Sequence, residues 1–212
     1  MTELARPTAA PFPWAEPFFT VGVTGTNGKT STTLLLGAAL AATGRSVLVE
    51  TTLGYALGGH ALDVPRTLQG YLDAFEQAAG AGCRDAAVEV TSQALAQGYA
   101  KRWRFDLAVF TNLSRDHVSQ HGSWEHYLAS KAQLFVHLGP GQSAVLNAAD
   151  ESALLIDRVT PEDVKRVWYR VPSRGPELCA SDLTAREVRV SIDGTQIALE
   201  PSPLADALGG NL

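Results

Sequence analysis

Short apolar runs recur along the chain up to residue 147, and polar or glycine-rich stretches separate them. The runs are "FFTVGVT" (18–24), "SVLVETT" (46–52), "DAAVEV" (85–90), "DLAVFTNL" (106–113) and "SAVLN" (143–147). Runs of this length and composition predict buried strands.

Segments with helical spacing lie between these strands. They are residues 30–43, which are rich in Ala and Leu and stop at Gly44, residues 67–82, a short piece before residue 106, and residues 123–138. Ser123 can cap the last of these helices, and Glu125 adds an acid to its first turn. Strands that alternate with helices predict an α/β fold with a doubly wound, mostly parallel sheet.

The pattern changes after about residue 160. The stretch "EVRVSIDGTQIALE" (187–200) alternates around Asp193-Gly194, which indicates a hairpin. We therefore expect residues 18–212 to form one domain, with residues 170–212 as a small antiparallel β appendage. Residues 1–17 hold four prolines and predict an extended N-terminal arm.

Composition narrows the class of protein. The 212 residues are 45% hydrophobic and 18% charged, as in ordinary globular domains, and the net charge of -5 argues against nucleic-acid and membrane-surface binding. Cys83 and Cys179 have no metal-site spacing, and no signal peptide or membrane-spanning run is visible. A cytoplasmic location is expected.

A glycine-rich turn links the first predicted strand to the first predicted helix, in "VGVTGTNGKTSTT" (21–33). Strand, glycine-rich turn, Lys-Thr and helix is the layout of a P-loop, whose backbone N–H groups surround phosphate oxygens. Lys29 would reach the terminal phosphates and Thr30 would ligate Mg²⁺. The general P-loop pattern requires glycine at 23, where Val23 stands, so a plain strand-to-helix turn is the alternative.

Two charged residues stand in apolar surroundings. Glu89 ends an apolar strand, where a carboxylate is costly unless it binds metal or pairs with a cation such as arginine. Lys131 shares a helix face with Leu128, Phe135 and Leu138. Its amine either snorkels to an edge or faces the nucleotide crevice.

A third cluster, "FTNLSRDHVSQHG" (110–122), directly follows a strand and contains Asp116, His117 and His121. Imidazole and carboxylate groups at a strand's C-terminal end indicate metal or substrate binding. Structural histidines are the alternative.

Four motifs in this order resemble the central ATPase domain of the Mur ligases, which are ATP-dependent amide ligases of peptidoglycan synthesis. They are "GVTGTNGKTSTT", "VEVTSQAL", "FDLAVFTNLSRDHVSQHGSWEHYLASKAQLF" and "VLNAADE". The resemblance covers about residues 19–160 and is strongest to the branch that makes UDP-N-acetylmuramoyl-tripeptide. It also accounts for Val23, because the family's own loop signature is T-G-T-N-G-K-[ST].

The resemblance implies a nucleotide and metal site. The phosphates of ATP would bind the loop residues Gly25, Thr26, Asn27, Gly28, Lys29 and Thr30. Thr30 would hold a first Mg²⁺, Glu89 would coordinate magnesium, and His117 would ligate a second Mg²⁺. Lys131 matches the family's carbamylated lysine, whose carbamate helps to hold that second ion. Lys29, Glu89, His117 and Lys131 would form the catalytic set.

Asn147 and Asp150 fall on the family's N-x-D-D stretch near the nucleotide, in which Ala149 replaces the first aspartate. Other departures lie on the substrate side. The expected Thr-Thr-Pro is Asp63-Val64-Pro65, and Tyr99 replaces an arginine. The resemblance therefore leaves the carboxylate and amine substrates unidentified.

The implied reaction is ADP-forming ligation through an acyl phosphate. The family's N- and C-terminal domains have no counterpart in these 212 residues, so we expect poor ligation by this chain alone unless a partner chain supplies the missing ligase domain. One alternative is a degenerate Mg-ATP-binding module without ligase activity. A kinase-like or phosphohydrolase P-loop protein is another alternative, which Lys131 and the "NLSRDH" motif disfavour.

Overall fold

The computed structural model describes residue 15, residues 18–114 and residues 122–209. In these residues ten strands form one sheet, in the order β10-β9-β8-β7-β6-β1-β5-β2-β3-β4. They are β1 (Phe19–Thr24), β2 (Val47–Thr51), β3 (Gly54–Leu57), β4 (His60–Leu62), β5 (Asp85–Glu89), β6 (Leu107–Phe110), β7 (Ser143–Asn147), β8 (Lys165–Arg170), β9 (Leu183–Ser191) and β10 (Gly194–Leu199).

The sheet is parallel from β2 to β9 and antiparallel at its two ends. β1 lies between β5 and β6 and is parallel to both, and β7 and β8 continue the parallel part. At one end β2, β3 and β4 are antiparallel neighbours, and at the other end β9 and β10 form the predicted hairpin. The predicted α/β class with an antiparallel C-terminal appendage is confirmed.

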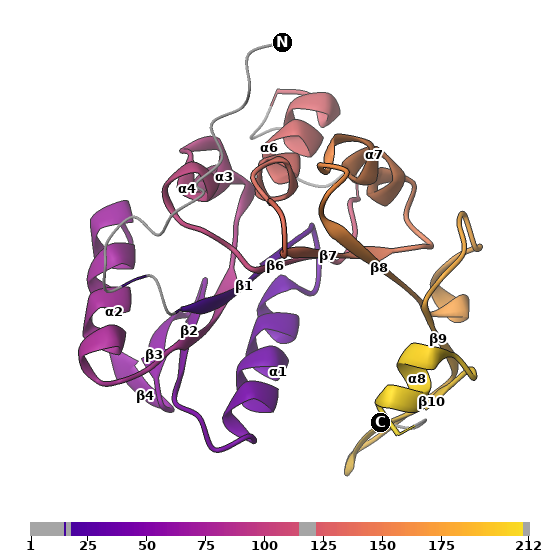
Figure 1. Cartoon of the computed structure of the whole chain (residues 1–212), viewed down its shortest axis with the longest axis horizontal. Coiled ribbons are helices and arrows are strands. Elements are labelled where there is room, and N and C mark those ends of the chain that lie inside the picture. Colours follow the sequence, from indigo (N-terminus) through magenta and orange to yellow (C-terminus); the bar gives the residue numbers. More distant parts are fainter. Residues whose placement is uncertain (1–14, 16–17, 115–121, 210–212) are drawn as a thin grey trace.

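Helices lie on both faces of the sheet (Figure 1). They are α1 (Lys29–Ala41), α2 (Leu68–Gly80), α3 (Ser92–Ala96), α4 (Tyr99–Arg102), α6 (Trp124–Val136), α7 (Glu151–Val159) and α8 (Pro203–Ala207), with a single 3₁₀ turn, η2 (Pro172–Arg174). In Figure 1, α1 lies below the sheet, whereas α3, α4, α6 and α7 lie above it. Ser123 caps α6 through the backbone N–H of His126, as the sequence predicts.

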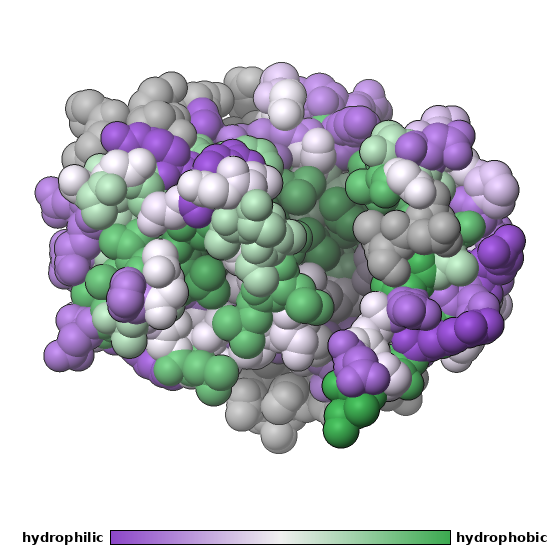
Figure 2. All heavy atoms as spheres, turned by 90° about the horizontal axis from the view of Figure 1, so that it is seen from below, coloured by the Kyte–Doolittle hydropathy of each residue, from purple (hydrophilic) through white to green (hydrophobic). Residues whose placement is uncertain are grey.

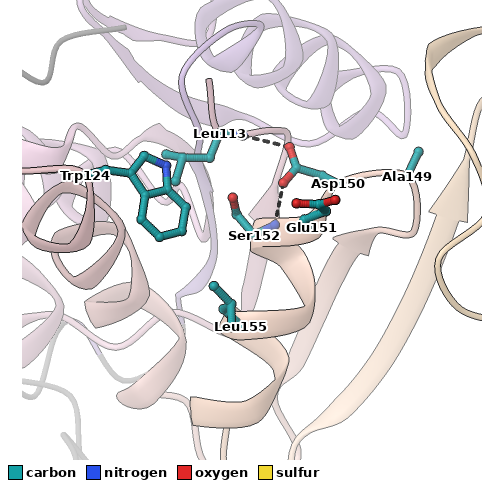
Figure 3. A pocket seen from close by; sticks show the side chains of 7 residues that line it. All are labelled: Leu113, Trp124, Ala149, Asp150, Glu151, Ser152 and Leu155. Carbon is teal, nitrogen blue, oxygen red and sulfur yellow. Dashed lines mark hydrogen bonds between the residues drawn. The ribbon is translucent and has the colours of Figure 1, made fainter. Parts of the chain in front are cut away.

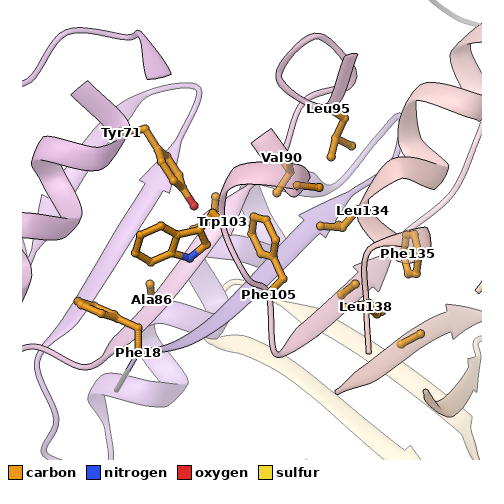
Figure 4. Packing of buried hydrophobic residues seen from close by; sticks show 14 of the residues in the cluster. Phe18, Tyr71, Ala86, Val90, Leu95, Trp103, Phe105, Leu134, Phe135 and Leu138 are labelled. Carbon is orange, nitrogen blue, oxygen red and sulfur yellow. The ribbon is translucent and has the colours of Figure 1, made fainter. Parts of the chain in front are cut away.

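The larger core lies on the face that α2 and α6 cover. Phe75 of α2 is fully buried, and its ring centroid lies 4.0 Å from that of Trp103 and 5.2 Å from that of Phe18. The Trp103 indole N–H donates to the hydroxyl of Thr20, which ties this aromatic group to β1. Figure 4 shows Phe18, Tyr71 and Trp103 of this group packed together. The packing fixes the position of the central strand.

A glycine in β1 lets α6 approach the sheet closely. A Cβ atom on Gly22 would lie 2.7 Å from the Phe105 ring and 3.2 Å from the Leu134 side chain. Leu134 is one helical turn after Lys131 on α6, and residues three apart lie on one face of a helix. The missing side chain at Gly22 therefore helps to bring Lys131 onto the loop that follows β1.

The opposite face carries a smaller apolar cluster. Val21, Val23 and Val109 are buried there, with Leu36 of α1 packed against them. Seen from this side, apolar side chains gather around a hollow in the middle of the molecule (Figure 2). Among the described residues, no helix is long and apolar enough to cross a membrane.

Several elements have no counterpart in the sequence-based prediction. The β3–β4 hairpin is built from short strands separated by Gly58 and Gly59, so no apolar run is visible there. β8 reads "KRVWYR", in which charged residues interrupt the apolar pattern. α7 begins with Asp150 as its N-cap residue. Because the sequence analysis assigned Asp150 to the nucleotide, its signal as a helix cap was missed.

Candidate functional site

The glycine-rich loop between β1 and α1 leaves the first turn of α1 open. Gly28 is the N-cap residue, with a left-handed φ of 81°, and it has no side chain to cap the helix. The N–H groups of a helix's first turn point outward along the axis and favour anions. The loop therefore offers the backbone donors that the sequence predicts for a phosphate group.

The segment after β6 holds this loop in place. The Thr111 hydroxyl donates to the carbonyl oxygen of Asn27 across 2.8 Å. The Asn112 side chain both accepts from the Asn27 N–H and donates to its carbonyl oxygen, at 3.1 and 3.0 Å. A Cβ atom on Gly25 would lie 1.9 Å from the Thr111 hydroxyl oxygen, so residue 25 has to be glycine for this contact.

A second set of hydrogen bonds holds Thr26. Its buried hydroxyl lies 3.2 Å from the Tyr127 hydroxyl of α6 and accepts from the Ser114 N–H across 3.0 Å. The loop is thus anchored by β6 and by α6. These contacts fix its shape without using the open backbone donors at Gly28.

Glu89 lies at the end of β5, directly beside the start of α1. One carboxylate oxygen accepts from the Thr30 hydroxyl across 2.7 Å and from the backbone N–H and hydroxyl of Thr52 across 3.0 and 3.2 Å. The other oxygen lies 4.0 Å from the Lys29 ammonium. Threonine donors and the Lys29 ammonium therefore satisfy this buried carboxylate, and within the described residues no arginine pairs with it.

Lys29 points into the loop. Its ammonium donates to the carbonyl oxygen of Thr26 across 2.9 Å, and the side chain is mostly buried. This position next to the open helix end is where a lysine would meet a terminal phosphate.

Lys131 is the most deeply buried charged residue that the structure describes, with 1% of its surface exposed. Its ammonium donates to the carbonyl oxygen of Gly25 across 2.7 Å and lies 4.4 Å from the centroid of the Tyr127 ring. Burial, followed by repulsion from Lys29, lowers the pKa of Lys131 to about 7, against the attraction of Glu89. Its amine faces the loop, so the snorkelling interpretation is wrong.

Asn147 and Asp150 make structural hydrogen bonds on the other side of the loop. The Asn147 amide donates to the carbonyl oxygen of Thr111 across 2.9 Å. The Asp150 carboxylate caps α7 and accepts from the Leu113 N–H across 2.8 Å. Both residues join the end of β7 to the segment that holds the loop, and a nucleotide contact stays a prediction for each.

A cavity of about 440 Å³ opens beside Asp150. The Trp124 indole stands on one side of it and the start of α7 on the other (Figure 3). Its lining residues are Leu113, Trp124, Ala149, Asp150, Glu151, Ser152 and Leu155. The cavity therefore adjoins the loop anchors Leu113 and Asp150 and lies near the candidate nucleotide site.

His117, with Asp116 and His121, lies outside the described residues, so its predicted role as a metal ligand stays a prediction. Within the described residues, no group of three or more His, Cys, Asp and Glu side chains is close enough to hold a metal ion. The Thr30 hydroxyl and the Glu89 carboxylate are nevertheless adjacent hard oxygen donors, which is the ligand type that Mg²⁺ prefers.

Sequence reasoning missed the residues that support the loop. Thr52, Thr111, Asn112 and Tyr127 carry no charge, so no anomaly singles them out. The available signal is position: residues 111 and 112 follow directly after a strand that a parallel sheet places beside the loop.

Comparison with known proteins identifies the family of this chain. A family model described as the Mur ligase middle domain matches residues 23–203. The UDP-N-acetylmuramoyl-L-alanyl-D-glutamate–2,6-diaminopimelate ligase of Solibacter usitatus is 38% identical over 184 residues, which are 84% of this chain and 36% of that protein. The ligase of the same name from Geobacter metallireducens is 39% identical over 152 residues, 66% of this chain and 30% of that protein. The chain thus spans about a third of the length of these curated relatives.

Solved structures agree with this result. One of a UDP-N-acetylmuramoyl-L-alanyl-D-glutamate–2,6-diaminopimelate ligase has a TM-score of 0.73 and 28% identity, and the match covers 92% of this chain and 38% of that one. A folylpolyglutamate synthase of Mycobacterium tuberculosis, solved with ADP and AMPPCP, has a TM-score of 0.62 and 18% identity over 88% of this chain and 48% of its own. The second likeness shows a shared fold.

Proposed function

Since this chain belongs to the family of the Mur ligase middle domain, we propose that it forms the ATP-binding core of an ADP-forming ligase that joins a carboxylate to an amine. The observation that carries the proposal is the convergence of Lys29, Glu89 and Lys131 on one glycine-rich loop. A plain strand-to-helix turn needs none of these three side chains. Buried ionisable groups that meet beside an open helix end indicate a functional site.

The loop and Lys29 bind the phosphates in this proposal. The donors are the open backbone N–H groups of residues 28–30, because those of Thr26 and Asn27 already donate to Asn112. Lys29 turns from the Thr26 carbonyl oxygen to the terminal phosphate. Asn147 and Asp150 would lie on the nucleoside side, and Asp150 lines the cavity at Trp124. The loop anchors keep the donors in one arrangement before nucleotide arrives, which lowers the cost of binding.

Thr30 and Glu89 fit a magnesium ion, since they present a hydroxyl and a carboxylate oxygen 2.7 Å apart. His117 and a carbamate on Lys131 would hold a second ion. Bound magnesium supplies positive charge where phosphoryl oxygens gain negative charge.

Lys131 is proposed to carry the carbamate. Its neutral amine would attack CO₂, forming an N–C bond and releasing a proton. A pKa of about 7 leaves much of the amine neutral near physiological pH, and full burial disfavours the ammonium. The product would be an anion directed at the loop, and together with His117 it would hold the second Mg²⁺.

The proposed substrates are a small-molecule carboxylate and an amine. A carboxylate oxygen attacks the γ-phosphorus, the bond between that phosphorus and ADP breaks, and an acyl phosphate forms. The amine nitrogen then attacks the acyl carbon, loses a proton, and phosphate leaves. Lys29 and the loop N–H groups hold the transferred phosphoryl and stabilise its growing charge.

Calorimetry with Mg-ATP tests the nucleotide site. Lys29→Ala should weaken binding by about 1.5–3 kcal/mol, the usual loss for one charge-assisted phosphate contact. Lys165→Ala, at the amino end of β8 and so at the other end of the strands from the loop, is the matched control and should bind like wild type. Equal affinity of wild type and Lys29→Ala would refute the site.

The ligase activity needs a separate assay. ADP release is measured over a panel of acids and amines, with product mass determined by mass spectrometry. ADP release that requires both an acid and an amine supports the proposal. Tight Mg-ATP binding without ADP release across the panel would replace it with a nucleotide-binding module.

A further inference from the structure

One face of the sheet is only partly covered by helices. A row of four valines crosses this face in register, one each from β1, β6, β7 and β8: Val23, Val109, Val145 and Val167. Paired residues of neighbouring strands point to the same face, and this face is the one that α1 covers. Because α1 packs on β1, β2 and β5, it buries Val23 and Val109. It leaves Val145 and Val167 half-buried.

The half-buried end of this row lies in a groove. In Figure 1, α1 and the β9–β10 hairpin both lie below the sheet. Figure 2, which looks at that side, shows the hollow between them, with apolar side chains in it. We call this hollow the α1 groove and define it by Leu36 of α1 and by Val145 and Val167 of its floor. Residues 30–41 of α1 contain no charged side chain, so the α1 wall of the groove is neutral.

The tip of the β9–β10 hairpin is apolar and exposed. Val188, Val190 and Ile192 alternate along β9 and into the turn, so they lie on one face of the hairpin. Their exposed fractions rise toward the tip and are 40%, 77% and 101%. The opposite face carries the ion pair between Glu187 and Arg189. Apolar side chains that are exposed together, rather than singly, indicate an interaction surface.

The hairpin tip and the α1 groove carry charges of opposite sign. Asp193 is exposed in the turn, directly after Ile192. Lys165 is exposed at the start of β8, two residues before Val167, so it lies on the groove side of the strand. Within the described ranges of the chain, neither Asp193 nor Lys165 takes part in an ion pair. The tip therefore joins an apolar side chain to an acid, and the groove joins an apolar floor to a base.

We propose that the α1 groove is the docking site for a second copy of this chain, whose hairpin tip enters it. Ile192 of one copy covers Val145 and Val167 of the other, and Asp193 pairs with Lys165. Two-fold symmetry lets each copy insert its own tip and receive the other's, so the contact closes at two copies. This inference goes beyond the nucleotide site and does not depend on it.

The chain itself carries both halves of the contact, which favours a second copy as the occupant. Filling the groove alone leaves Ile192 in water, and covering the tip alone leaves Val145 and Val167 half-buried. A two-fold pair covers both and matches the charges of Asp193 and Lys165. The competing occupant is an apolar helix of another protein, which fits a groove of this kind but makes no demand on the hairpin tip.

Sedimentation velocity of the 212-residue chain tests the proposal. A hairpin tip in a groove is a small contact, and small interfaces are weak, so we expect a dissociation constant on the order of 100 µM. The chain should sediment as a monomer at about 10 µM and mostly as a dimer at about 1 mM. A monomer throughout this range, or polymers that keep growing with concentration, would overturn the two-fold dimer.

Variants at the tip show whether the hairpin makes the contact. Ile192→Asp should leave a monomer at every concentration, because it places a charge against the apolar floor of the groove. Leu53→Asp is the matched control, since Leu53 is also largely exposed, at 76%, and lies in the turn between β2 and β3. It should dimerise like wild type. A dimer that survives Ile192→Asp would mean that the hairpin tip is not the contact.

Exchange of the two charges tests the pairing of tip and groove. Lys165→Glu and Asp193→Lys should each weaken the dimer about fivefold, because each brings two like charges together. The chain that carries both substitutions should regain the wild-type dissociation constant. Failure of the double variant to recover would show that Asp193 does not meet Lys165 and would overturn the proposed arrangement.

The dimer and the proposed function can fail separately. Sedimentation needs no nucleotide, and calorimetry with Mg-ATP is carried out at about 10 µM protein, where the monomer dominates. A chain that dimerises but does not bind Mg-ATP would refute the proposed function alone. A chain that binds Mg-ATP but stays monomeric would refute the inference about the α1 groove alone.

Discussion

The ammonium of Lys131 donates a hydrogen bond to the carbonyl oxygen of Gly25 across 2.7 Å, although 106 positions separate the two residues. Four residues earlier on the same helix, the Tyr127 hydroxyl lies 3.2 Å from that of Thr26. One face of α6 thus contacts two successive residues of the loop. Substitutions on this face of α6 should therefore change the affinity for nucleotide.

Lys131 should carry a carbamate in the folded protein. With ¹³C-labelled bicarbonate and Mg²⁺, carbon NMR should show a carbamate signal that is missing in Lys131→Ala. Since CO₂ reacts with the neutral amine, the signal should grow as pH rises through about 7, the pKa of Lys131. An unmodified Lys131 at saturating bicarbonate and Mg²⁺, at pH 8, would contradict this.

Gly25→Ala should abolish most nucleotide binding. The new Cβ would lie 1.9 Å from the Thr111 hydroxyl oxygen, at a φ of 151°, so the contact between Thr111 and the loop must break. We expect Mg-ATP affinity to fall at least tenfold, roughly the 1.4 kcal/mol or more that one lost positioning contact costs.

Gly44→Ala is the matched control for that change. Gly44 also has a positive φ, 82°, but a Cβ there would meet nothing within 4 Å. It should cost about 1–2 kcal/mol of stability through backbone strain alone and leave Mg-ATP affinity unchanged in calorimetry. A similar loss of affinity in both variants would mean that strain, not the Thr111 contact, is responsible.

Glu50 should make the protein less stable as pH rises. Its pKa is about 8 in the folded state against 4.5 ordinarily, so the folded state holds the proton more tightly. The stabilisation is complete below pH 4.5 and is lost as pH approaches 8, with a slope of at most about 1.4 kcal/mol per pH unit. Urea unfolding between pH 5 and 8 should show a flatter profile for Glu50→Gln.

Glu76→Gln serves as the comparison for that profile, because Glu76 is exposed on α2. It should keep the wild-type pH dependence. If Glu50→Gln and wild type have parallel profiles, the folded state does not hold the Glu50 proton more tightly than the unfolded state.

Phe75→Ala should destabilise the fold by about 3–5 kcal/mol, the usual cost of removing a fully buried phenylalanine. The loss follows from the cavity left between Phe18, Tyr71 and Trp103. Leu35→Ala, on the exposed side of α1, should change stability by less than about 0.5 kcal/mol. Thermal or urea unfolding measures both.

The sequence predicted the parallel part of the fold well because buried parallel strands are continuous apolar runs. β7 matches its predicted bounds, 143–147, and β1 starts one residue later than predicted and ends where expected. Strands at the sheet edges were harder to find. β8 has only three apolar or aromatic residues between charged ones, and β3 and β4 are too short to form a run.

At the site, the residues found from sequence were those that break a pattern. Lys131 stood out as a charge in an apolar stripe, and its direction toward the loop is confirmed. Glu50 escaped notice because a glutamate near a strand end resembles a solvated residue. Its surroundings come from α2, α4 and β3, which only the tertiary fold brings together.

The order of strands in the sheet also governs when the glycine-rich loop acquires its shape. β1 is made first, yet the residues that hold its loop come from β6 and α6, and Thr111 bonds to Thr24 across 87 positions of chain. During synthesis the loop leaves the ribosome long before its anchors exist. Such non-local contacts form slowly, so we expect nucleotide to bind a chain that has already folded through α6. There it should slow unfolding rather than speed assembly.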